Sequence, residues 1–176
     1  MVFLLRREVR RGAVRRRSRL RALGTDLAVP NSADSSVLTL RVKTSRRTEL
    51  VNITDPVSHL VAASGVSSGV CHLYVPHTTA AVTINEGADP DVARDIEMAL
   101  DRMAPRKGGY KHFEQNSDAH VKSSLVGVSC SVFIEGGRLR LGRWQAIFFC
   151  EFDGPRNREV QLKIQADPPP GSQSRP

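Results

Sequence analysis

The stretch HTTAAVTINE, residues 77–86, decides the fold and ends a strand in an unusual way. The residues before it, 69–76, alternate in polarity as a half-buried strand does. Continuing that period places His77 on the apolar face, and Asn85 and Glu86 close the stretch. The alternation predicts a core residue at this position, yet the residue is an ionisable histidine. This indicates either a buried polar site or a histidine whose hydrogen bonds are satisfied within the core. The pattern leaves both readings open.

Strand patterns dominate the chain on both sides of this stretch, and two helices interrupt them. Asp55, Pro56 and Gly65 are suited to the cap, the first position and the left-handed stop of a short helix. A second helix is expected to begin after a cap at Asp89 and to end before Pro105. Strands around two main helices, without β-α-β alternation, predict an α+β fold with an antiparallel sheet or sandwich. The other expected elements are strands at 37–44 and 48–54, paired through a turn at 45–47; a strand region at 69–86, broken near Pro76; a long loop at 108–124; strands at 126–134 and 138–152, joined by a turn at Gly136-Gly137, with a bulge at Gly142; and a strand at 159–165.

The composition suits one domain with extensions. The chain has 176 residues, of which 40% are hydrophobic, enough for one core. Residues 1–34 carry nine arginines against three acidic residues, a net charge of +6, whereas the rest carries 17 basic and 15 acidic residues, a net of +2. Because the folded part has little net charge, nucleic-acid binding is not expected as its main role. The sequence predicts an Arg-rich extension at 1–35, a domain at 36–166 and a Pro-rich tail at 167–176.

Targeting and redox signals are weak. The apolar run at 2–5 is too short for a signal peptide or a membrane span. The Arg-rich start is compatible with a mitochondrial transit peptide, but we favour an extension without structure or a start codon placed too early. Three separate cysteines, Cys71, Cys130 and Cys150, favour small core residues over a disulfide framework. A cytoplasmic protein is therefore expected.

Histidines supply the first candidate site. His59 is expected on the surface of the first helix, and His72 on the opposite strand face from His77. His112 and His120 lie eight residues apart in the polar loop. Three converging imidazoles would suit zinc, with an open position for water or substrate. The spacing by itself favours separate structural histidines.

Acidic and basic residues supply further candidates. Glu86, expected close to His77 along a bent strand, could orient an imidazole or act as a general base. Arg156 and Arg158 flank a Gly-Pro turn, and Lys122 belongs to a Lys-Ser-Ser run. Such groups can bind phosphate, although a solvated turn is the commoner explanation for any one of them.

Four segments together resemble the YjbQ family, which is also known as the secondary thiamine-phosphate synthase family. They are LVNIT (50–54), HTTAAVTINEGADPDVARDIE (77–97), YKHFEQNSDAHVKSSLVG (110–127) and GRLRLGRWQAIFFCEFDGPRNR (137–158). They occur in the family's order, and the resemblance covers about 37–165. It implies a compact α+β domain that assembles as a homotrimer, binds a small phosphorylated metabolite and has no membrane association.

The resemblance also implies site residues. By position, the family's histidines correspond to His77, His112 and His120, which would gather around a divalent metal such as zinc or around an anion. His77 and Glu86 are then the expected catalytic residues. The residues expected to bind substrate or anion are Thr78, Thr79, Asn85, Lys122, Ser123, Gln145, Arg156 and Arg158. The neighbouring Trp144 is expected in the core or at a subunit interface.

The family name implies a thiamine phosphate synthase, which joins a pyrimidine diphosphate to a thiazole phosphate and releases pyrophosphate. A divalent ion and nearby cations would neutralise the leaving group, although magnesium prefers oxygen ligands and three imidazoles suit zinc. Two other classes stay open. One is a metal-dependent hydrolase of a small phosphorylated or acyl substrate, with Glu86 as base; the other is a non-catalytic trimer that binds an anionic metabolite.

Overall fold

The computed structural model describes residues 21–22, 25–26 and 37–168. The predicted extension at 1–35 and tail at 167–176 therefore lie almost entirely outside the described residues. Within 1–35, two short strands, Arg21–Ala22 (β1) and Thr25–Asp26 (β2), pair with each other in antiparallel fashion.

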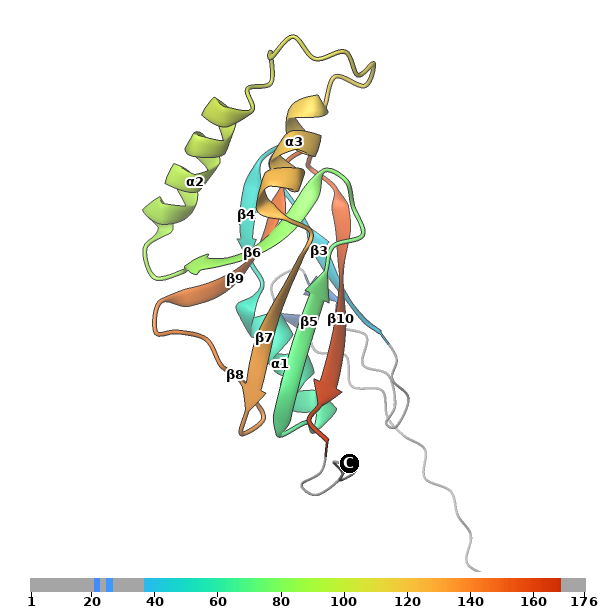
Figure 1. Cartoon of the computed structure of the whole chain (residues 1–176), viewed down its shortest axis with the longest axis vertical. Coiled ribbons are helices and arrows are strands. Elements are labelled where there is room, and N and C mark those ends of the chain that lie inside the picture. The colour runs from blue at the N-terminus through green and yellow to red at the C-terminus, as the bar shows by residue number, and fades with distance from the viewer. Residues whose placement is uncertain (1–20, 23–24, 27–36, 169–176) are drawn as a thin grey trace, which may run out of the picture.

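Two antiparallel sheets form the body of the fold (Figure 1). Their strands are Leu38–Lys43 (β3), Glu49–Asn52 (β4), Ser68–Tyr74 (β5), Ala80–Glu86 (β6), Ser129–Glu135 (β7), Arg138–Leu139 (β8), Gln145–Glu151 (β9) and Asn157–Ala166 (β10). One sheet has the order β3-β10-β5-β7-β8, and the other has the order β4-β9-β6. Every pairing in both sheets is antiparallel, so the predicted α+β architecture is confirmed.

Three helices occur within the described residues: Thr54–Ser64 (α1), Pro90–Met103 (α2) and Ser117–Val126 (α3). The sequence predicted the first two. Asp89 caps α2 as expected, since its Oδ1 accepts the Asp91 N–H at 2.8 Å. Gly65 ends α1 with a φ of +73°, the predicted left-handed stop. Asp55 lies in the first turn of α1 and does not cap it.

The prediction of a loop throughout 108–124 is wrong in its second half, where α3 lies. This helix has no apolar stripe, because polar side chains such as Asp118, Lys122 and Ser123 are among those it buries. Its periodicity was hidden for that reason.

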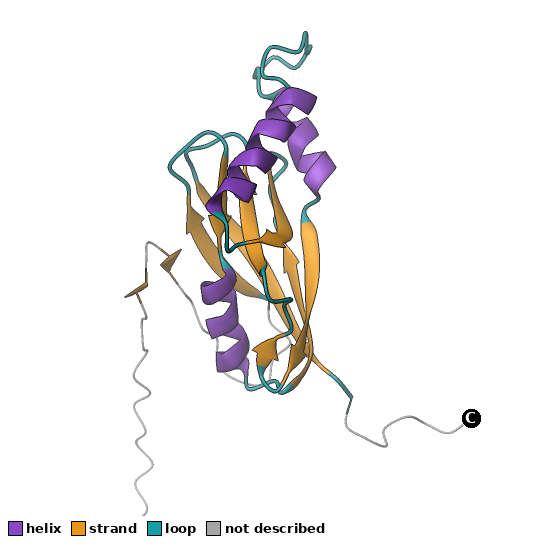
Figure 2. Cartoon of the chain, turned by 90° about the vertical axis from the view of Figure 1, so that its left-hand side faces the viewer, coloured by secondary structure: helices purple, strands orange, loops and turns teal. Residues whose placement is uncertain are grey.

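The apolar residues form two layers. The larger core lies between the two sheets and α1, with Leu40, Leu73 and Phe149 among its fully buried members. A smaller cluster, which includes Phe148 and Leu100, covers the other face of the three-stranded sheet beneath α2 and α3. Figure 2 shows α1 beside the lower part of the sheets and the other two helices together at the upper end. Strand β9 is consequently buried on both faces from Ala146 onward.

Two expectations about strand pairing are wrong. Strands β3 and β4 do not pair with each other; β3 pairs with β10 and β4 with β9. The expected long strand 138–152 is two strands, β8 and β9, in different sheets, so the parity shift near Gly142 marks a change of sheet and not a bulge. The Gly136-Gly137 turn is confirmed, with φ values of +58° and +73°.

None of the helices in the described ranges is both long and apolar enough to cross a membrane.

Candidate functional site

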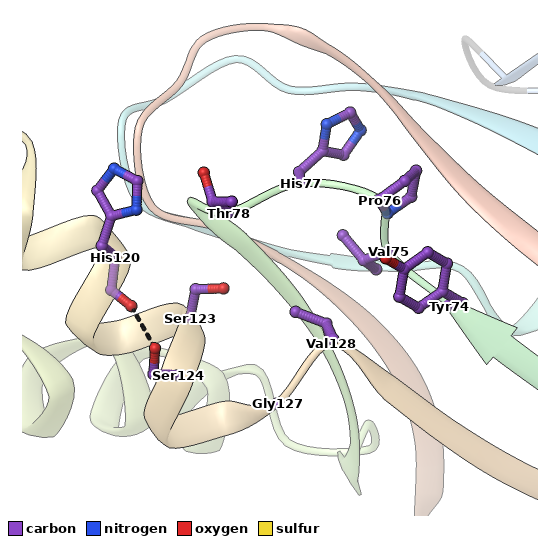
Figure 3. Close-up of a pocket in the computed structure, with 10 residues that line it drawn as sticks. All are labelled: Tyr74, Val75, Pro76, His77, Thr78, His120, Ser123, Ser124, Gly127 and Val128. Carbon is purple, nitrogen blue, oxygen red and sulfur yellow. Dashed lines mark hydrogen bonds between the residues drawn. The ribbon is translucent and has the colours of Figure 1, made fainter.

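A cavity of about 620 Å³ opens where the end of β5, the following segment and α3 meet (Figure 3). Its volume lies in the range typical of small-molecule sites. Tyr74, Val75, Pro76 and Val128 form an apolar wall. The polar side chains that line it are His77, Thr78, His120, Ser123 and Ser124. Figure 3 shows Thr78 between the two imidazoles.

The end of β5 places His77 at this cavity. The register of β5 with β10 pairs Tyr74 with Gln161, and two further steps would place Pro76 opposite Glu159. Proline has no N–H for a ladder, and the chain leaves the sheet here. The Glu159 N–H instead donates to Nε2 of His77 at 3.0 Å. A side-chain nitrogen therefore takes the place of a backbone acceptor at the strand end.

This hydrogen bond determines the chemical state of the ring. A nitrogen that accepts an N–H carries no proton, so the neutral His77 ring holds its proton on Nδ1. Burial lowers the pKa of His77, and the positive charge of Arg158 lowers it further, while Glu151 and Glu159 partly oppose the shift. The ring thus presents a neutral Nδ1–H donor at physiological pH.

Arg158 and Thr79 do not belong to the lining of the cavity, but they are bonded to each other. The Arg158 guanidinium binds the Glu151 carboxylate through two bonds, Nη2 to Oε1 at 2.6 Å and Nε to Oε2 at 2.7 Å. Its Nη2 also donates to the Thr79 hydroxyl at 2.9 Å. Both charged side chains are at most 9% exposed. Arg158, expected as an anion ligand, is engaged in a buried ion pair.

The other two predicted histidines lie together at α3. The ring of His120 meets the ring of His112 nearly at a right angle, with centroids 5.5 Å apart. Nε2 of His112 lies 3.7 Å from Oε2 of Glu114. Ser124 donates its hydroxyl to the His120 carbonyl at 2.9 Å. His77 and His120 both line the cavity and His112 contacts His120, so the three histidines lie at the same end of the molecule.

Their arrangement in one chain does not fit a metal centre. Among the residues the structure describes, no three His, Cys, Asp or Glu side chains are grouped so that they could hold a metal ion. Nε2 of His77 already accepts the Glu159 N–H, and coordination through Nδ1 would require the ring to lose its remaining proton. Metal binding stays a prediction.

The remaining predicted anion ligands at this end have protein partners. Lys122 is 1% exposed and binds Asp118 at 3.2 Å as well as Asp101. Ser123 donates its hydroxyl to the Ala80 carbonyl at 2.7 Å, which ties α3 to β6. Arg156 binds Asp153 at 2.8 Å, and its side chain is 53% exposed. Of the predicted anion ligands, Thr78 and Ser123 are the ones that line the cavity.

Glu86, Asn85 and Gln145 lie at the opposite end of β6, where Glu86 pairs with Gln145. At about 3.3 Å per residue, the seven-residue strand separates them from the Thr79 end by roughly 20 Å. The expectation that Glu86 lies close to His77 is wrong, because the strand does not fold back. The adjacent Trp144 is 56% exposed, which excludes the predicted core position within one chain.

Some lining residues and partners were not predicted. Tyr74 and Val128 flank the cavity, but nothing in a single strand pattern marks them as ligand contacts. Ser124 lies in the same Lys-Ser-Ser run as Ser123, so the sequence offered a reason to include it among the predicted anion-binding residues. The partner of Glu151 could not be found from the sequence, since only the fold brings Arg158 to it.

The cysteines take no part in this site. All three are free, in agreement with the predicted absence of a disulfide framework. Burial raises the pKa of Cys71 and Cys150 to about 12 and that of Cys130 to about 11. Thiols with such values stay protonated, so they are poor nucleophiles and poor metal ligands.

The fold and the cavity define a class: a small α+β protein whose body consists of two antiparallel sheets and which carries a cavity of metabolite size. Within that class, the chain belongs to the family of UPF0047 proteins that are YjbQ-like, whose family profile matches residues 38–167. The predicted family membership is thereby confirmed.

Curated relatives and solved structures agree with this assignment. The chain is 50% identical over 127 residues to UPF0047 protein MJ1081 of Methanocaldococcus jannaschii, covering 72% of this chain and 92% of that protein. It is 48% identical over 127 residues to UPF0047 protein YugU of Bacillus subtilis, covering 72% and 96%. A crystal structure of a YjbQ/UPF0047-family protein from Clostridium acetobutylicum matches with a TM-score of 0.71 and 52% identity, over 73% of this chain and 99% of that one. A YbjQ-like protein from Sulfolobus solfataricus P2 matches with a TM-score of 0.72 and 32% identity, over 75% and 97%. None of these four names states an activity.

Proposed function

We propose that the protein binds a small phosphorylated metabolite in the cavity between His77 and His120. The single observation that carries this proposal is the division of the cavity into an apolar wall and a group of hydrogen-bonding side chains. Phosphate oxygens need several donors, and the His77 Nδ1–H, the Thr78 hydroxyl and the His120 ring can supply them. The apolar wall, with Tyr74 at its edge, would hold the organic part of the ligand.

The family resemblance supplies the candidate reaction, the synthesis of thiamine phosphate with release of pyrophosphate. In such a reaction these donors would bind a phosphate group of the substrate and stabilise charge on the leaving pyrophosphate. Lys122 and Arg158 would not contribute directly, because each is buried in an ion pair. The structure therefore supports ligand binding without catalysis better than it supports the synthase reaction. The hydrolase reading has less support, since Glu86 is remote from the cavity.

We further propose that the protein is a homotrimer, as the resemblance implies. Large apolar side chains that a single chain leaves exposed support an interface between copies: Phe133 is 71% and Trp144 is 56% exposed. Light scattering coupled to size-exclusion chromatography would measure the mass of the assembly directly. A monomeric mass at working concentration would contradict the trimer.

Ligand binding is tested by calorimetric titration with inorganic pyrophosphate, first on the wild type and then on His120→Ala. One hydrogen bond to a charged group contributes about 1.5–3 kcal/mol, so the variant should bind about tenfold more weakly or worse. The matched control is His59→Ala, because His59 is exposed on α1 and does not line the cavity. Unchanged affinity in His120→Ala would contradict the proposed site.

The reaction is tested separately by measuring pyrophosphate release from the two thiamine precursors. Release that requires both precursors supports the synthase. Turnover of one precursor with water supports the hydrolase, and binding without turnover supports a metabolite-binding protein.

A further inference from the structure

We propose that the buried Glu151–Arg158 pair is a positioning device for His77: it holds the segments around the ring so that Nε2 accepts the Glu159 N–H and Nδ1 carries the proton that His77 donates to the ligand. The identity of that ligand rests on the proposed function, whereas the positioning itself concerns the protein alone. Glu151 and Arg158 are positioning residues in this account, and neither lines the cavity.

Glu151 is a rigid anchor because all of its hydrogen-bonding capacity toward the protein is used. Its side chain is 0% exposed. Oε1 accepts from Arg158 and from the backbone N–H groups of Phe152 and Asp153, at 2.6, 3.1 and 3.0 Å. Oε2 accepts from Arg158 and from the Thr44 hydroxyl, at 2.7 and 3.2 Å. Five donors around a fully buried carboxylate leave it no second orientation.

Arg158 connects Glu151 to the two chain segments that determine which nitrogen of His77 carries the proton. Its Nη2 bond to Thr79 holds the backbone two residues beyond His77. Its own backbone directly precedes Glu159, whose N–H is the donor to Nε2. One guanidinium therefore fixes the donor segment and the acceptor segment relative to each other. Lysine could keep the charge but could not bind the carboxylate bidentately and Thr79 together.

The resulting hydrogen bond disfavours the other forms of the ring. A proton on Nε2, in the second neutral tautomer or in the imidazolium, would point at the Glu159 N–H. The charged groups that act on the ring are Arg158, Glu151 and Glu159, and His120 shares its cavity. His77 is then a hydrogen-bond donor through Nδ1, whereas the family resemblance implied a catalytic residue and metal ligand at this position.

The test is the tautomer of His77, read from the nitrogen chemical shifts of the ¹⁵N-labelled full-length protein without ligand. In the wild type we expect one dominant form, with a protonated Nδ1 and an unprotonated Nε2. In Arg158→Lys the minor tautomer should rise several-fold although the charge is kept. A merely structural role for Arg158 would change stability without moving this signal in the folded protein.

Thr79→Val is the second variant, because it removes one hydroxyl and leaves the buried ion pair intact. It should fold and shift the tautomer in the same direction by a smaller amount. The matched control is Thr83→Val, in strand β6 four residues after Thr79, which should leave the signal unchanged. A wild-type tautomer in both folded test variants would overturn the proposal.

Failure of the proposed function is distinguishable from failure of this inference. If inorganic pyrophosphate does not bind the wild type but the tautomer responds as expected, the positioning is supported and the proposed ligand class is contradicted. If pyrophosphate binds and the tautomer does not respond, the positioning is contradicted and the ligand site stands.

Discussion

The two ends of strand β6 carry motif residues of similar chemistry in opposite environments. At the Thr79 end, the Thr79 hydroxyl is bonded to a buried ion pair, and the neighbouring polar side chains line a cavity between β5 and α3. At the Glu86 end, Asn85 accepts the Glu86 N–H and Gln145 accepts the Gly142 N–H, and both side chains are exposed. One end is supported by contacts from distant strands, and the other by contacts within a few residues.

This difference indicates which end is preorganised within one chain. Charged groups that are buried and bonded from several elements hold one geometry, because any displacement would break several bonds in a low dielectric. Exposed polar groups with local contacts rearrange freely. The His77 end can therefore bind a ligand with little reorganisation, whereas the Glu86 end would need a second surface to order it.

The largest effect should come from removing the anchor of the preorganised end. Glu151→Ala leaves Arg158 charged, buried and without its partner, which costs about 3–5 kcal/mol in the free energy of unfolding. Urea denaturation of the wild type and the variant measures this change in the free energy of unfolding. Glu135→Ala is the control, since Glu135 binds Arg140 at the surface, where an ion pair contributes about 0–1 kcal/mol. Equal effects of the two substitutions would show that the buried pair is not an anchor.

A smaller effect is expected at Lys122, which separates a structural role from ligand binding. Lys122→Met keeps the volume of the side chain but removes one of the two cationic partners of Asp118, so that Arg47 alone remains. The free energy of unfolding should therefore fall by about 1–3 kcal/mol. The affinity for pyrophosphate, measured by calorimetry, should stay the same. A clear loss of affinity in the folded variant would instead place Lys122 in the ligand site.

The pH dependence of stability sharpens the comparison further. Because the pKa of His77 is lowered in the folded state, the unfolded chain binds more protons as the pH falls through the ordinary histidine range. The contribution of His77 is therefore fully present above about pH 6.5 and is lost on acidification toward its folded-state pKa. Unfolding free energies of the wild type and His77→Asn, measured between about pH 7.5 and pH 5, should converge as the pH falls. A constant difference across that range would contradict the assigned ring state.

The smallest effect should come from the exposed end. Glu86→Ala should change the free energy of unfolding by less than about 0.5 kcal/mol and leave pyrophosphate affinity unaltered. Both are measured in the same unfolding and titration experiments. A strong loss of affinity would mean that Glu86 reaches a ligand site in another way, for example from a neighbouring copy.

The strands and caps that follow from local chemistry could be predicted. Alternation placed Leu73 in the core, and a proline after Asp89 marked the start of α2. Helix α3 could not be predicted from periodicity, because its buried face carries Lys122 and Asp118, which satisfy each other. The pairing of β3 with β10 and of β4 with β9 could not be predicted either, because the local sequence of a strand does not show which distant strand it pairs with.

For the site, the family resemblance, and not the spacing of the residues, grouped His77, Thr78 and His120 as expected site residues, and all three line the cavity. Only the tertiary structure decided what each can do. Arg158 meets Thr79 across 79 residues of chain, and Glu159 meets His77 across 82. Those contacts place Arg158, an expected anion ligand, in a buried ion pair, and they make His77, an expected metal ligand, a donor through Nδ1. The reason is physical: a side chain's charge and hydrogen-bonding state depend on its neighbours in space, and folding alone brings β6, β9 and β10 together.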